Sequence, residues 1–153
     1  LIGAVEGAAI GGGATILLHF DAVFICPEAK IKYPFSDLGL APEVGSSYLL
    51  FQALGYQKAA QLLFESKPID GKKYFEIGLA KYVGEDFLIK ANAYAHALKE
   101  QSLGSIMETK AILKSFTEDD LIKARSLETQ AMKRLFGSED NLKAVEKFFA
   151  RKK

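Results

Sequence analysis

Residues 10–18 read IGGGATILL, and this stretch decides the fold. An apolar run over residues 1–5 leads toward it and predicts a β-strand, while the residues after the glycines predict a helix. Glycine adopts backbone conformations closed to other residues and lets a ligand approach the main chain closely. The first turn of a helix leaves amide N–H groups without intrahelical partners. The stretch therefore predicts a strand-to-helix turn that aims amides at a negatively charged oxygen.

The bulk composition is that of a globular protein. The 153 residues suffice for one domain with a hydrophobic core, and the 49% hydrophobic and 25% charged fractions are ordinary for such a domain. A net charge of +1 gives no argument for nucleic-acid binding, and no apolar run approaches the length of a membrane span, so we expect neither partner. The single cysteine, Cys26, excludes an internal disulfide and fits a reducing compartment. We expect a cytoplasmic protein of bacterial type, and a peroxisomal or mitochondrial location stays open.

Two parts of the chain differ in composition and in the spacing of their apolar residues. Residues 1–47 are rich in glycine, alanine and branched apolar residues and predict strands over 1–5, 21–25 and 30–33. From Glu43 onward the spacing of apolar residues is mainly helical and predicts helices over 43–54, 56–65, 70–78, 87–102, 105–115, 118–136 and from 138 on, with a short strand over 79–83. We therefore expect an α/β core over residues 1–85 and a helical region over 86–153.

The sheet predicted from these strands is small. The chain also begins with a strand-like run at Leu1 and without methionine. A short sheet exposes unpaired strand edges, which proteins normally cover. We therefore expect an upstream portion of the domain to be missing here, or a partner subunit to cover the edge.

Several short motifs together resemble one known family. They are the glycine-rich residues 5–13, Asp21, the loop 33–45 with its two prolines, and the segments 67–71 and 78–80. These residues resemble the crotonase superfamily, the enoyl-CoA hydratases and isomerases, along essentially the whole chain, which matches the C-terminal part of that domain. The resemblance implies an α/β spiral of ββα turns followed by a helical trimerisation region. It also implies an acyl-CoA substrate and a homotrimer or hexamer.

The resemblance assigns the glycines to thioester binding. In this family two backbone N–H groups hold the thioester oxygen and stabilise an enolate, and Gly12 matches one of them, flanked by Gly11 and Gly13. The second donor comes from a more N-terminal segment. Phe148 and Arg151 match positions that contact the CoA adenine and phosphate in some members, although an amphipathic helix with a basic end is the simpler interpretation of these residues. Neither a metal ion nor a separate cofactor is implied, because coenzyme A is part of the substrate.

The acid–base residues favour one reaction over another. Hydratases of the family carry glutamates at two positions that are Thr15 and Phe35 here, and neither side chain can activate water at neutral pH. The loop YPFSDLGLAPE, residues 33–43, instead resembles the peroxisomal-type Δ3,Δ2-enoyl-CoA isomerases. In those enzymes a single glutamate moves a proton between C2 and C4, and Glu43 matches it. Val44 follows at a position where glycine is common.

An apolar site strengthens a carboxylate as a base. We expect Phe35 and Leu38 to supply such surroundings for Glu43, and Thr15 to line the same substrate pocket. The sequence thus favours a Δ3,Δ2-enoyl-CoA isomerase of fatty-acid β-oxidation, with Glu43 as the base and the Gly12 amide as an oxyanion donor.

Other interpretations stay open. A hydratase-like or thioesterase-like enzyme of the same superfamily would take its carboxylate from an upstream segment, and a non-catalytic acyl-CoA-binding module is a different class again. Asp37, the other carboxylate of the loop, fits a turn or cap residue. His19 and His96 have no partners at metal-ligand spacing, so we interpret His19 as structural, and Cys26 as a small buried residue.

Overall fold

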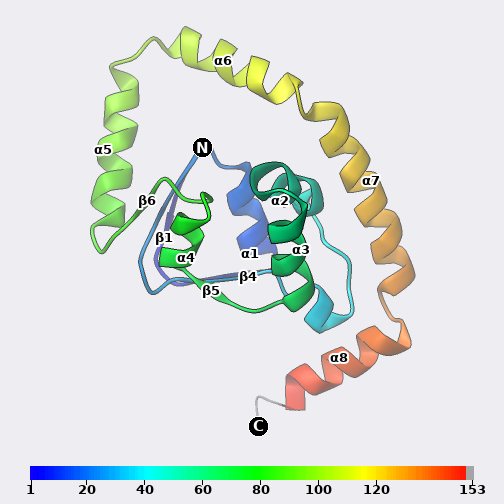
Figure 1. The fold of residues 1–153 in the computed structure, drawn as a ribbon. Helices are drawn as coiled ribbons and strands as arrows, with labels where there is room; N and C mark the ends of the chain where they lie inside the picture. The colour runs from blue at the N-terminus through cyan, green and yellow to red at the C-terminus, as the bar shows by residue number, and fades with distance from the viewer. Residues whose placement is uncertain (151–153) are drawn as a thin grey trace.

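In the computed structural model (Figure 1), which describes residues 1–150, short strands form two three-stranded sheets. One sheet has the order β1-β3-β6, all parallel, and the other has the order β2-β4-β5, with β2 and β4 parallel and β5 antiparallel. The first sheet comprises β1 (Ile2–Val5), β3 (Ala22–Ile25) and β6 (Tyr82–Val83), and the second comprises β2 (Ala8–Ile10), β4 (Lys30–Lys32) and β5 (Ile69–Asp70). Because β1 pairs with β3 while β2 pairs with β4, the ββ unit of residues 2–10 lies beside the ββ unit of residues 22–32, strand by strand.

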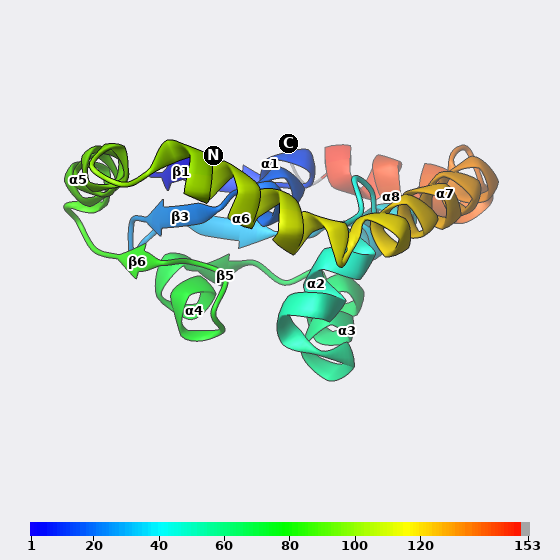
Figure 2. The same ribbon diagram turned by 90° about the horizontal axis from the view of Figure 1, so that it is seen from above.

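Short helices cover the sheets, and long helices follow in an arc. The short segments are α1 (Gly12–Thr15), η1 (Ile16–His19), η2 (Ser36–Leu38), α2 (Ser46–Leu54), α3 (Tyr56–Glu65) and α4 (Gly71–Glu76). The arc consists of α5 (Phe87–Lys99), α6 (Leu103–Ser115), α7 (Glu118–Leu135) and α8 (Glu139–Ala150). In Figure 2, α2, α3 and α4 lie to one side of the sheets. The arc contacts the core where α5 packs on β1 and β3, α7 on α2, and α8 on η2. Lys110 of α6 also pairs with Asp21, directly before β3. Over residues 1–150, none of these helices combines the length and apolar character of a membrane span.

Strand β3 is the centre of the hydrophobic core. All four of its residues are buried, as expected for a parallel strand that is covered on both faces. Successive side chains of a strand point to opposite faces, so Val23 and Ile25 enter the main core while Phe24 enters a second cluster beneath α5. There the Phe24 ring lies 5.6 Å from the Tyr94 ring, centroid to centroid. The first helix of the arc therefore shares apolar contacts with the α/β part.

The predicted strands over 1–5, 21–25 and 30–33 and the predicted later helices are confirmed to within a few residues. Two strands were not predicted, β2 and β5, because segments of three and two residues are too short to show a period. The helix expected from Glu43 begins only at Ser46, since Val44 and Gly45 have φ values of 58° and 77°. The helix expected after the glycines is one α-helical turn followed by a 3-10 turn. The division at residue 85 stays a prediction.

Gly71 provides a test of the packing in this core. It begins α4, its N–H donates to the carbonyl oxygen of Pro27 at 3.1 Å, and a Cβ on it would lie 2.0 Å from the carbonyl oxygen of Cys26. Because the obstacle is backbone, we expect Gly71→Ala to lower the free energy of unfolding by about 1–3 kcal/mol, the usual cost of overpacking. Urea denaturation followed by circular dichroism measures this change.

Gly104, in the first turn of α6, is the matched control. A Cβ there meets no atom of residues 1–150 within 4 Å outside its own helix turn. Gly104→Ala should leave stability unchanged or raise it by about 0.5–1 kcal/mol through helix propensity. Equal effects of the two substitutions would contradict the close approach at Gly71.

Candidate active site

The glycine loop and the loop after β4 meet at one edge of the second sheet. β2 and β4 are parallel, with Ile10 opposite Lys32, so the segments that follow them leave the sheet on the same side. The N–H of Gly11 extends this pairing by donating to the carbonyl oxygen of Lys32 at 3.0 Å. Segments that leave adjacent parallel strands at their carboxyl ends are a common place for ligand sites.

The glycines leave two backbone amides unused. The carbonyl oxygen of Gly11 accepts from the N–H groups of Ala14 and Thr15 at 2.8 and 2.9 Å, which closes the first turn of α1. Gly11 has a φ of 57°, in the region that favours glycine. Gly12 and Gly13 are exposed, and within residues 1–150 their N–H groups donate to no protein acceptor. They can therefore serve an anionic oxygen of a ligand.

Glu43 lies beside these amides although it is 31 positions further along the chain. A Cβ placed on Gly12 would lie 3.5 Å from Oε1 of Glu43. The Glu43 side chain is half-buried in the turn that precedes α2. The structure thus brings together a carboxylate, which can accept a proton, and amide donors, which can hold a developing negative charge.

Thr15 and Phe35 lie in the packed interior. Thr15 is fully buried, and its hydroxyl donates to the carbonyl oxygen of Gly12 at 3.1 Å. Phe35 is buried in the main core. In these places Thr15 supports the first turn of α1 and Phe35 supports the loop from beneath.

Two long-range hydrogen-bond groups hold the turn after Glu43. Nε2 of His19, at the end of η1, lies 2.8 Å from the carbonyl oxygen of Val44. The buried carboxylate of Glu128, on α7, accepts from the N–H of Gly45 at 2.7 Å and from the N–H and hydroxyl of Ser47 at 2.9 and 2.6 Å. We interpreted His19 as structural from the sequence, whereas Glu128 was missed, because nothing in the pattern of α7 distinguishes it from the exposed acidic residues around it.

Two cavities adjoin these loops. One, of about 420 Å³, opens between the turn and α7 and is lined by Pro42, Glu43, Val44, Arg125, Glu128, Thr129, Met132 and Lys133. The other, of about 440 Å³, lies between the loop after β4 and α8 and is lined by Ile10, Lys32, Pro34, Asp37, Leu38, Ala144, Lys147 and Phe148. The second cavity brings together two of the predicted site residues, Leu38 and Phe148. Arg151 lies outside the described residues.

Comparison with known proteins identifies the family of this chain. The family model described as Enoyl-CoA hydratase/isomerase matches residues 1–153. The chain belongs to the enoyl-CoA hydratase/isomerase family. It is 28% identical over 154 residues to the peroxisomal enoyl-CoA delta isomerase 3 of Mus musculus, covering 99% of this chain and 49% of that protein. It is 27% identical over 155 residues to the crotonyl-CoA hydratase of Syntrophomonas wolfei, covering 100% and 60%.

A crystal structure of a protein from Acinetobacter baumannii has the same fold, with a TM-score of 0.88 and 39% identity over 94% of this chain and 61% of that one. The chain therefore spans about 60% or less of the length of these relatives. An isomerase and a hydratase lie at nearly the same identity. Similarity thus shows the family and does not choose between the two reactions.

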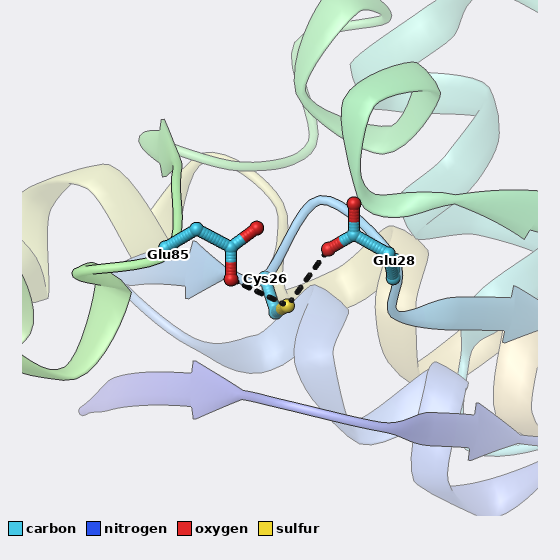
Figure 3. A group of neighbouring side chains, drawn as sticks. All are labelled: Cys26, Glu28 and Glu85. Atoms are coloured by element: carbon cyan, nitrogen blue, oxygen red, sulfur yellow. Dashed lines mark hydrogen bonds between the residues drawn. The ribbon is translucent and has the colours of Figure 1, made fainter.

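Cys26 lies away from this site, between two carboxylates (Figure 3). It is half-buried rather than fully buried, and its Sγ lies 3.3 Å from Oε2 of Glu28 and 3.9 Å from Oε2 of Glu85. A backbone hydrogen bond at Glu28 lowers the pKa of the Cys26 thiol, but desolvation and the two carboxylates outweigh it and raise the pKa. The three groups are close enough to share a metal ion, although exposed acidic groups commonly cluster in this way without one. We interpret the cluster as a hydrogen-bonded link between the end of β3 and the segment after β6.

Asn141 attaches α8 to the loop that contains Leu38, and its replacement tests this attachment. It is 5% exposed, its Nδ2 donates to the carbonyl oxygen of Leu38 at 2.7 Å, and its Oδ1 accepts from the N–H of Gly137 at 3.0 Å. Asn141→Ala leaves both groups without this partner, so we expect it to lower the free energy of unfolding by about 1–3 kcal/mol.

The exposed Asn92 of α5 donates to the carbonyl oxygen of Leu88 in its own helix and is the matched control. Asn92→Ala should stay within about 0.5 kcal/mol of the parent, as surface substitutions usually do. Both values come from urea denaturation. A loss for Asn141→Ala no larger than that for Asn92→Ala would refute the attachment.

Proposed function

We propose that the protein carrying this chain is a Δ3,Δ2-enoyl-CoA isomerase that acts on acyl-CoA thioesters in fatty-acid β-oxidation. The observation that carries the proposal is the position of the Glu43 carboxylate beside the free amide of Gly12. With the thioester oxygen on the Gly12 N–H, Glu43 removes a proton from C2 of a 3-enoyl-CoA. The resulting dienolate keeps its negative charge on the thioester oxygen, and the protonated Glu43 returns the proton to C4, which moves the double bond to C2–C3.

The surroundings support a reaction with one carboxylate. Hydration needs one group to activate water and another to protonate carbon. At the two positions where the resemblance implies hydratase glutamates, Thr15 is fully buried and bonded to Gly12, and Phe35 is part of the core. Proton transfer between two carbons of one substrate needs only a single base, which Glu43 supplies.

The amides of the glycine loop are suited to the dienolate. Backbone donors already oriented in the folded protein stabilise an oxyanion without reorganising during the reaction, and this is often the largest single contribution to such catalysis. Gly12 supplies one such donor, and the resemblance implies a second from a more N-terminal segment of the family's domain.

The cavity beneath α8 is our candidate for part of the CoA site. Lys147 and the aromatic ring of Phe148 line it together with Lys32, whose ammonium group pairs with Asp37 at 2.5 Å. Ammonium groups attract phosphates, and an aromatic face can stack on adenine. Phe148 is the residue to which the resemblance assigns CoA contact, and Arg151, the other matching residue, lies outside the described part of the chain.

Replacing the base tests the reaction. Glu43→Gln keeps the shape of the side chain but cannot accept a proton. We expect kcat for isomerisation of a 3-enoyl-CoA to fall at least about 100-fold, the usual contribution of a general base, with KM within about threefold. Ultraviolet absorbance of the 2-enoyl-CoA thioester follows the reaction in the whole protein.

Glu76→Gln, an exposed carboxylate on α4 paired with Lys73, should keep the parent rate. Unchanged turnover in Glu43→Gln would refute the proposed base. Hydration of a 2-enoyl-CoA, or thioester hydrolysis, by a parent that does not isomerise would indicate the hydratase-like or thioesterase-like alternative. CoA binding without turnover would indicate a binding module.

We also propose that the protein assembles as a homotrimer or hexamer through the helices after residue 85. Large apolar side chains are exposed along the arc, among them Leu103 (71% exposed), Phe116 (76%) and Phe136 (74%). Exposed apolar surface of this kind is typical of subunit interfaces.

We also propose a reducing compartment such as the cytoplasm, because the chain has a single cysteine.

Light scattering on the whole protein tests the assembly. Phe116→Asp buries a charge if α6 and α7 meet a neighbouring subunit, so we expect it to shift the trimer or hexamer toward monomer. Phe64→Asp, on α3 and 68% exposed, is the matched control and should leave the assembly unchanged. A monomeric parent at micromolar concentration would contradict the proposal.

A further inference from the structure

A strained turn joins Glu43 to α2. Val44 has a φ of 58°, in the left-handed region, where a β-branched side chain is rarely found because its Cβ crowds the following carbonyl. Gly45 continues the turn at a φ of 77°, which glycine adopts freely. The strain therefore lies on the residue directly after Glu43. Such a conformation persists only where the surrounding structure holds it.

His19 holds the turn from the side of the glycine loop. Its Nε2 lies 2.8 Å from the carbonyl oxygen of Val44. A carbonyl oxygen only accepts, so the ring donates through Nε2–H. His19 ends η1, which follows α1 directly, so this bond ties the strained residue to the short helix that carries Gly12.

Glu128 holds the turn from the opposite side. Its carboxylate is 6% exposed and accepts three hydrogen bonds, from the N–H of Gly45 and from the N–H and hydroxyl of Ser47. Gly45 and Ser47 lie at the start of α2, which has no capping side chain from its own N-cap residue. A negative charge is stabilised at a helix N-terminus, so α7 supplies the cap that the local sequence lacks.

We propose that His19 and Glu128 are positioning residues that hold Val44 in its strained conformation and thereby keep the Glu43 carboxylate beside Gly12. The catalytic consequence rests on the proposed isomerase function, whereas the conformational part rests on the contacts alone. Loss of either contact lets Val44 relax toward a negative φ, which turns the preceding peptide and moves Glu43 away from the glycine loop.

His19→Phe, made in the whole protein, removes the donor and keeps a ring of similar size. We expect kcat for 3-enoyl-CoA isomerisation to fall about tenfold with KM within about twofold, the scale of one strained backbone residue released. Hydrogen exchange at the amides of Gly45 and Ser47 should speed up about tenfold. His19→Gln restores a side-chain N–H donor and should recover most of both losses, while His96→Phe, the same change at an exposed site on α5, should alter neither.

The decisive comparison repeats His19→Phe in a Val44→Gly background. Glycine is not strained at this φ, so little drives the turn to relax when the His19 bond is lost. We expect the effect on kcat and on exchange to shrink from about tenfold to less than about twofold. Glu128→Gln exchanges one accepting oxygen for an amide donor. If this variant folds, its effect on kcat and on exchange should also be larger with Val44 than with Gly at position 44. If it does not fold, the His19 variants alone test the positioning role.

Equal effects of His19→Phe in the two backgrounds would overturn the proposal. So would a crystal structure of His19→Phe in which Val44 keeps its positive φ and Glu43 its place beside Gly12. If the parent does not isomerise 3-enoyl-CoA, the exchange rates and the crystal structure still test the positioning role. In that case the isomerase proposal is refuted, and the positioning role of His19 and Glu128 is judged separately.

Discussion

The parallel pairing of β2 with β4 is the constraint on which the site depends. It places the ends of two short strands side by side, so the glycine loop and the loop after β4 leave the sheet at the same edge. The hydrogen bond from the Gly11 N–H to the carbonyl oxygen of Lys32 carries this pairing one residue beyond the strand. Without it, Gly12 and Glu43 would have no reason to meet, since 31 positions of chain separate them.

The pairing itself depends on burial of the neighbouring sheet. β3 pairs with β1 and is covered on both faces, by the main core and by the cluster under α5. Polar contacts then fix the positions of the later helices relative to the core, which apolar packing alone does not specify. Glu128 attaches α7 to the start of α2, and Asn141 attaches α8 to the loop at Leu38. Each provides a hydrogen-bond partner to backbone groups that packing shields at least partly from water. Leaving such groups unpaired costs free energy, so these contacts favour one arrangement of the helices.

Much of the fold could be predicted from local patterns. The apolar runs that became β1 and β3, the alternating segment that became β4, and the helical spacing from α2 to α8 were visible. The α/β fold with a helical continuation was visible too. The strands β2 and β5 were not, because a two- or three-residue strand is defined by its neighbours and has no period of its own. The start of α2 was placed three residues too early, because Val44 gives no local sign of a positive φ. Glu43 and Gly12 could be named from motifs, whereas Glu128 and the contact of His19 with Val44 could not.

By itself, the sequence determined the family, and it predicted Gly12 and Glu43 as candidate site residues, because both follow from residue types at short spacings. Only the tertiary structure decided that the carboxylate lies beside the amides, that Thr15 and Phe35 face inward, and that α7 and η1 both hold the turn. The physical reason is the range of the interactions. Turns and helix starts are governed by neighbours along the chain, but a hydrogen bond between residues 45 and 128, or 19 and 44, exists only after the core has brought distant segments together.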